Sequence, residues 1–172
     1  MSNNKLAFVA AMVAMMFALA ACSQDKAADT AAQATPAETA PVPMPAPGSD
    51  AAAWKKYLAD VVMKNMQGVK TNRPYMYFVP EGSDDKANMD RENQLDNVKT
   101  VVARGVLPGN MLAFGGPDSA TTADLVVEAF SEGQAGTLKD VVVLFVGAQA
   151  DSERVQAALG TVGASYRFAE MK

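Results

Sequence analysis

Hydrophobic and polar residues alternate along the second part of the chain with two different periods. Apolar residues recur every three or four positions over 50–67 and, more sparsely, over 84–104. This spacing puts them on one side of a helix, and Gly68 and Gly105 follow as stop signals. The pattern therefore predicts two amphipathic helices.

Two shorter helices are predicted nearer the C-terminus. Residues 121–131 carry Leu, Val, Ala and Phe at helical spacing, and Thr121 and Asp124 have the spacing of a capping box. The range 152–159 has the same period, and Gly160 together with Gly163 should end that helix.

Four apolar segments between and after the helices have strand character. They are 75–79, 111–114, 141–146 and 166–169. The third consists of six successive apolar residues, four of them valine, which is typical of a strand covered on both faces at the centre of a parallel sheet. In the last, Tyr166 and Phe168 flank Arg167, so we expect one solvated face and a position at the sheet edge.

The order is therefore a helix, then strand and helix three times, then a strand. This alternation predicts an α/β fold: a small three-layer domain with a mostly parallel four-stranded sheet, helices on both faces and right-handed crossovers. Residues 50–172 are enough for one such domain. The alternative is an α+β two-layer sandwich, in which the last strand pairs antiparallel and all helices share one face.

The N-terminal pattern differs from everything that follows it. Lys5 precedes an almost uninterrupted apolar run over 6–21, and the segment has no acidic residue. These features are typical of a signal peptide, predicted to be residues 1–21. The run ends in Leu19, Ala20, Ala21 and Cys22, the last being the single cysteine of the chain.

This ending resembles the lipobox of bacterial lipoprotein precursors. The resemblance implies that the thiol of Cys22 is alkylated with diacylglycerol and that Cys22 becomes the first residue after cleavage. In that family aspartate at the next position favours the inner membrane; Ser23 stands there, so we expect a lipid anchor on the periplasmic face of the outer membrane, with the inner membrane as the alternative. Acyl chains add about 0.8 kcal/mol of membrane binding per buried methylene.

Two other interpretations of this segment stay open. About sixteen apolar residues are fewer than the roughly twenty that span a bilayer, yet a retained anchor helix is one alternative. The other is ordinary secretion, with cleavage by a general peptidase at the small residues before Cys22.

The next segment, residues 22–49, is predicted to be a tether. It is rich in Ala, Thr and Gln, and Pro41, Pro43, Pro45 and Pro47 occupy alternate positions. Such a sequence has no apolar pattern from which to build a core, and the prolines favour extended polyproline II. A spacer between lipid and domain is the simplest interpretation.

Composition narrows the chemistry of the domain. Residues 50–172 contain 13 Lys and Arg against 16 Asp and Glu, which disfavours nucleic acid as a partner. They contain no cysteine and no histidine, so no disulfide is available, the commonest zinc ligand is missing and no side chain ordinarily titrates near neutrality. We predict neither a cofactor nor a metal.

A weak candidate ligand site follows from the predicted sheet. Ligands of parallel sheets bind beyond the carboxyl ends of the strands, and the acidic residues Glu81, Asp84, Asp118 and Asp151 come after successive strands. Helix capping explains such residues without any ligand. The functional alternative is a cation shared by the carboxylate oxygens of Asp84, Asp85, Asp118 and Asp151.

Motifs for catalysis are largely missing. Ser83 and Lys86 match the Ser-x-x-Lys spacing of penicillin-binding proteins, but the companion motifs are not present, and Ser83 is better interpreted as a helix cap. Trp54 and Tyr57 are expected in the core, with exposure to a partner or a second copy as the alternative.

Two functional classes remain. The first is a non-enzymatic lipoprotein, a binding or accessory module that contacts the membrane through its lipid and a protein or cell-wall component through its domain. The second is a small carboxylate- or metal-dependent envelope hydrolase. A deep acidic pocket at the strand ends would favour the enzyme, and a surface of capped helices the binding module.

Overall fold

The computed structural model of the chain describes residues 41–172, so the predicted signal peptide, Cys22 and most of the predicted tether lie outside the described residues. Helices and strands alternate along the described range: α1 (Ala51–Lys64), β1 (Tyr75–Phe78), α2 (Asp85–Arg104), β2 (Met111–Gly115), α3 (Ser119–Ser131), β3 (Val142–Gly147), α4 (Gln149–Val162) and β4 (Ser165–Glu170). Each helix and strand expected from the hydrophobic pattern is present.

The four strands form one parallel sheet in the order β1-β2-β3-β4. The α/β prediction is confirmed, and the α+β alternative is wrong, because β4 pairs parallel with β3, with Ser165 beside Val142. The physical reason is the connection between them. The 14 residues of α4 carry the chain back to the end of the sheet at which β3 starts, so that β4 can run in the same direction. A short turn could only reverse the chain direction.

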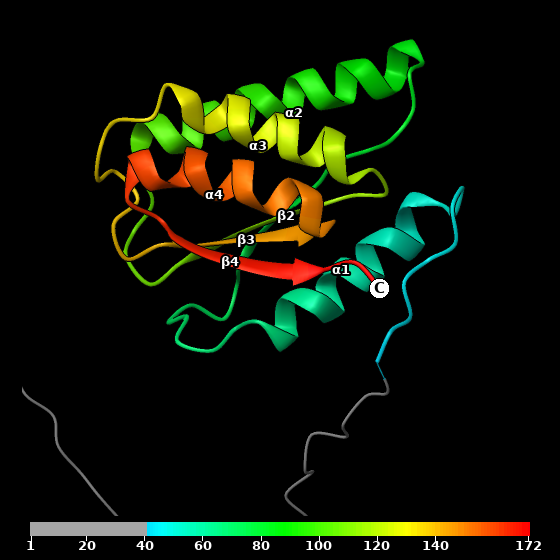
Figure 1. The fold of residues 1–172 in the computed structure, drawn as a ribbon, viewed down its shortest axis with the longest axis horizontal. Coiled ribbons are helices and arrows are strands. Elements are labelled where there is room, and N and C mark those ends of the chain that lie inside the picture. The colour runs from blue at the N-terminus through cyan, green and yellow to red at the C-terminus, as the bar shows by residue number, and fades with distance from the viewer. Residues whose placement is uncertain (1–40) are drawn as a thin grey trace, which may run out of the picture. The chain divides into compact units, whose positions relative to one another are not determined.

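Helices cover both faces of this sheet. Figure 1 shows α2, α3 and α4 together on one face and α1 alone on the other. Alternate residues of the central strands enter two separate cores: Leu112, Phe114, Val143 and Phe145 on the three-helix side, and Met111, Ala113, Leu144 and Val146 on the α1 side. The continuous apolar run of β3 is therefore explained by burial on both sides.

The apolar stripe of α1 packs on the sheet. Trp54 and Tyr57 are 3% and 4% exposed, and their rings meet edge to face at 5.9 Å. The alternative that they are presented to a partner is therefore wrong. Leu58 packs so closely that a Cβ on Gly115 would lie 2.4 Å from its Cδ2 atom, so a larger residue at that point of β2 would force the Leu58 side chain to shift.

The starts and ends of the helices differ in detail from the predictions. α3 begins two residues early, because the side chain of Asp118 accepts a hydrogen bond from the Thr121 amide at 2.6 Å, and the capping box of Thr121 and Asp124 is wrong. Gly160 lies inside α4, which ends only at Gly163 in the left-handed conformation. A glycine weakens a helix by about 1 kcal/mol but does not end it.

No helix within residues 41–172 is long and apolar enough to span a bilayer.

Candidate functional site at the carboxyl ends of the strands

Two of the four acidic residues predicted at the strand ends cap helices. Asp84 is the N-cap of α2 and accepts from the Ala87 amide at 2.9 Å. Asp118 has the same position and role at α3. The prediction that Ser83 caps this helix is wrong, because Asp84, the next residue, is the N-cap. Each of these carboxylates satisfies an amide that would otherwise lack a partner.

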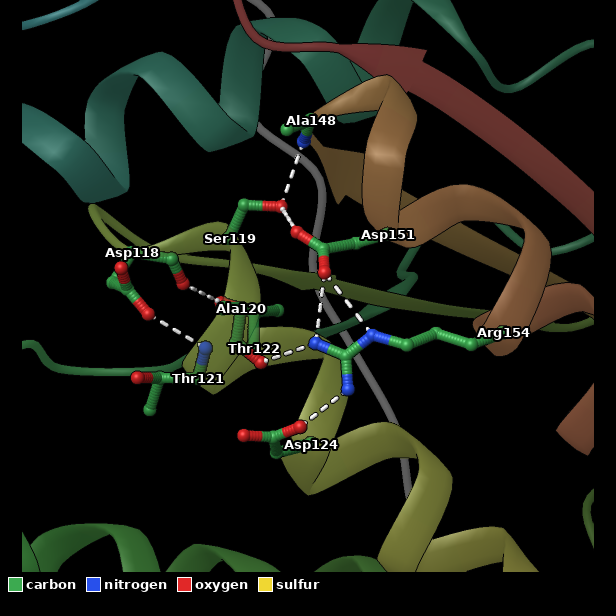
Figure 2. Close-up of polar contacts among 9 residues, drawn as sticks. All are labelled: Asp118, Ser119, Ala120, Thr121, Thr122, Asp124, Ala148, Asp151 and Arg154. Carbon is green, nitrogen blue, oxygen red and sulfur yellow. Dashed lines mark hydrogen bonds and ion pairs between the residues drawn. The ribbon is translucent and has the colours of Figure 1, made fainter.

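Asp151 belongs to a different arrangement, drawn in Figure 2. The Ser119 hydroxyl donates to Asp151 Oδ2 at 2.6 Å, and its oxygen accepts from the Ala148 amide at 2.7 Å. Ala148 is the N-cap residue of α4 and has no side chain able to cap it. A serine at the start of α3 therefore supplies the polar contact that the start of α4 lacks.

Arg154 extends this network across the gap between the two helices. Its Nε and Nη2 atoms donate to Asp151 Oδ1 at 3.0 and 2.8 Å, and Nη2 also donates to the Ala120 carbonyl at 3.0 Å. Nη1 is paired with Asp124. The guanidinium group thus ties α4 to the first two turns of α3. We call Ser119, Asp151 and Arg154 the α3–α4 latch.

The electrostatics of the latch disfavour acid-base catalysis. The hydrogen bond from Ser119 lowers the pKa of Asp151, the pair with Arg154 lowers it further, and partial burial opposes both. A carboxylate with a lowered pKa is a weak base, and the Ser119 hydroxyl already donates to it, so this pair is poorly suited to making a nucleophile. The latch is best explained as structural.

Glu81, the fourth predicted residue, lies elsewhere, at an apolar hollow of about 230 Å³. Residues that follow each of the four strands line this hollow, together with Trp54 of α1 and residues from the end of the predicted tether. The lining residues are Met44, Pro45, Pro47, Trp54, Glu81, Pro117, Ala148 and Met171. The Trp54 indole N–H is buried beside it without an acceptor among the described residues. Residues 44–47 therefore pack on the domain here, and the Val42 amide donates to Asp60 Oδ2 at 3.3 Å.

The four acidic residues are thus not brought together. Between residues 41 and 172 no group of three acidic side chains is close enough to hold a metal ion. The strand order offers a reason for the missing crevice. Ligand crevices in open parallel sheets form where the strand order reverses, and here spatial order follows chain order throughout.

Sequence reasoning missed Ser119 and Arg154. The three-residue spacing of Asp151 and Arg154 on a helix was a visible signal for an ion pair. The contact of Ser119 with Asp151 spans 32 residues, and no local pattern announces it.

Comparison of the chain with protein-family models, with curated proteins and with solved structures found no match. What the fold defines is a small α/β domain with an all-parallel four-stranded sheet.

Proposed function

We propose that this protein is a membrane-anchored binding or accessory module of the bacterial cell envelope. Lipid on Cys22 would hold it at the periplasmic face of the outer membrane, and the chain before the domain would serve as a spacer. The domain would contact an envelope protein or a cell-wall component.

The observation that carries the proposal is how the strand-end carboxylates are used. Asp84 and Asp118 cap helices, and Asp151 is engaged by Ser119 and Arg154. A hydrolase of the carboxylate type needs an acid or base that is free to exchange a proton with substrate. The hollow lined by residues that follow all four strands is mostly apolar, which suits contact with a side chain better than proton transfer.

The anchor can be tested by labelling cells with a clickable palmitate analogue. We expect the chain to take up label and to fractionate with the outer membrane, and Cys22→Ala to lose both properties. Ser23→Asp is the matched control, since it should keep the label but move the protein to the inner membrane. Wild-type chain without label, free in the periplasmic extract, would refute the anchor.

The binding role can be tested by photo-crosslinking in cells. A photoreactive residue at Glu81, on the rim of the hollow, should capture a defined envelope component. The control position is Leu107, which is 78% exposed but lies in the loop before β2, at the opposite ends of the strands. Identical capture from both positions, or none from Glu81, would count against the hollow as a contact surface.

A further inference from the structure

The β1 edge of the sheet has backbone groups without partners among residues 41–172. β1 lies at this edge and pairs only with β2. The Val79 amide donates to the Gly115 carbonyl, at 2.9 Å, so by the alternation of a strand the backbone groups of Tyr75 and Tyr77 also face β2. Those of Met76 and Phe78 therefore face outward, and no hydrogen bond joins them to another described residue.

The same two residues line an open groove of about 580 Å³. α1 contributes Ala51 and Lys55 to one wall, and the start of α2 forms the other. The Lys55 ammonium lies 5.4 Å from the centre of the Phe78 ring. Tyr75 and Met76 are 50% and 45% exposed, which is high for apolar strand residues. The strand itself is therefore open and uncharged, while the walls of the groove carry the charged side chains of Lys55, Asp84, Lys86 and Asp90.

The opposite edge also has outward-facing backbone groups, because the amides of Ser165 and Met171 face β3, but its strand is charged. β4 carries Arg167, whose guanidinium donates to the carbonyls of Asn65 and Gln67. A charged side chain on an edge strand discourages pairing with another chain, whereas β1 has the uncharged sequence Tyr-Met-Tyr-Phe. An assembly through β1 would accordingly close at two copies and not continue as a fibre.

Two prolines limit how β1 can pair. Pro74 and Pro80 are the next residues in the outward-facing series, and neither has an N–H to donate. The Pro80 carbonyl is also occupied, since it accepts from Arg91 Nη1 at 3.0 Å. The available ladder thus consists of Met76 and Phe78 alone.

We propose that β1 pairs antiparallel with β1 of a second copy, about a twofold axis at Tyr77. In this register Met76 lies opposite Phe78 of the other copy, and each such pair exchanges two hydrogen bonds, so the outward N–H and C=O groups of both residues are satisfied. A shift of two residues would place Pro74 or Pro80 opposite one of the donors and lose bonds. The prolines thus select one register.

The side chains of β1 also suit this register. Tyr77 would face its own copy across the axis on the three-helix side, and Met76 would face Phe78 on the α1 side. Aromatic pairs and sulfur-aromatic contacts both stabilise facing strands. No like charges meet within the paired strands, because β1 has none.

Disulfide trapping tests the register. The full chain carries Cys22→Ala, so that an introduced thiol is its only one. Across the axis the two Tyr77 Cα atoms would lie about 4.5 Å apart, within disulfide range, so Tyr77→Cys should form a dimer on mild oxidation. Tyr75→Cys is the matched control on the same strand and face: its two copies would be about 13 Å apart and should stay monomeric.

Random collision predicts the reverse order, because Tyr75 is the more exposed residue. Equal or faster dimer formation by Tyr75→Cys would overturn the proposal. So would the absence of dimer from both variants while each thiol reacts with a maleimide, or capture by Tyr77→Cys of other proteins only.

A second pair of variants avoids any loss of folding from the Tyr77 change. Met76→Pro removes an outward N–H and no internal bond, and Met76→Ala keeps that N–H. In sedimentation over a range of concentrations, we expect Met76→Pro to weaken self-association roughly thirtyfold, because two of the four bonds are lost. Met76→Ala should stay closer to wild type. Monomeric wild-type protein at every concentration, or equal behaviour of the two variants, would overturn the proposal.

Discussion

The α3–α4 latch makes a quantitative prediction about stability. Ser119 is 9% exposed and holds two contacts, one from the Ala148 amide and one to Asp151. Ser119→Ala removes both and leaves the start of α4 without a cap. We expect the folded state to lose stability, with little change in the fold, because alanine fits where serine was.

The magnitude follows from the two bonds. A neutral bond from a backbone amide contributes about 1 kcal/mol, and a bond to a charged carboxylate about 1.5 kcal/mol or more. The Asp151 side chain is 16% exposed, so the second contribution is reduced by solvent. We expect a loss of about 2 kcal/mol at neutral pH, equivalent to a shift of the urea midpoint by about 1 M.

The effect should depend on pH in a defined direction. The hydrogen bond from Ser119 is the largest cause that lowers the pKa of Asp151 below its ordinary value of 3.8. A lowered pKa in the folded state stabilises the protein above the ordinary value, and this contribution disappears as the pH falls through the lowered one. The difference between wild type and Ser119→Ala should therefore be full above about pH 5. It should shrink toward about 1 kcal/mol as the pH falls through the lowered pKa of Asp151, because only the Ala148 bond then distinguishes the two proteins.

The assay is urea denaturation of the purified protein, followed by the fluorescence of its single tryptophan, the buried Trp54. Ser131→Ala is the matched control: this serine lies at the other end of α3, is exposed and donates to the Glu128 carbonyl within its own helix. It should change stability by less than about 0.5 kcal/mol at any pH. A similarly small effect of Ser119→Ala, or a difference that does not narrow in acid, would refute the reasoning.

Two further predictions concern packing, and both can be measured by thermal denaturation followed by circular dichroism. A Cβ on Gly116 would lie 2.0 Å from the Val79 carbonyl oxygen, so Gly116→Ala should destabilise the protein by about 3 kcal/mol or more. Gly160 has open space around it inside α4, so Gly160→Ala should be neutral or stabilising by up to about 1 kcal/mol. Equal effects of the two substitutions would contradict the close approach at Gly116. The Trp54 indole N–H has no acceptor among the described residues, so Trp54→Phe should lower the stability of the folded protein clearly less than Trp54→Ala. For Trp54→Ala we expect a loss of about 3–5 kcal/mol. Equal losses of stability would indicate that the indole N–H makes a polar contact.

Local sequence was enough to predict the helices, the strands and their layers. The six apolar residues before Gly147 indicated a strand buried on both faces, and β3 enters both cores. Arg167 between two aromatic residues indicated an edge, and β4 is one. The expected solvated face of this strand is wrong, because Arg167 bonds to the carbonyls of Asn65 and Gln67 and Ala169 packs in the core on the α1 side. These predictions succeed because burial imposes a period on nearby residues, and a period is visible in a single sequence.

Tertiary structure decided what the polar residues do. Asp84, Asp118 and Asp151 looked equivalent along the chain, yet two cap their own helices and the third is held by Ser119 from another helix. The sequence also did not determine the order of the strands in the sheet. In the observed order no reversal occurs, so the type of ligand crevice that forms at a reversal is not expected at the strand ends. Hydrogen bonds depend on distances of a few tenths of an ångström between residues far apart in the chain, and no local period records such distances.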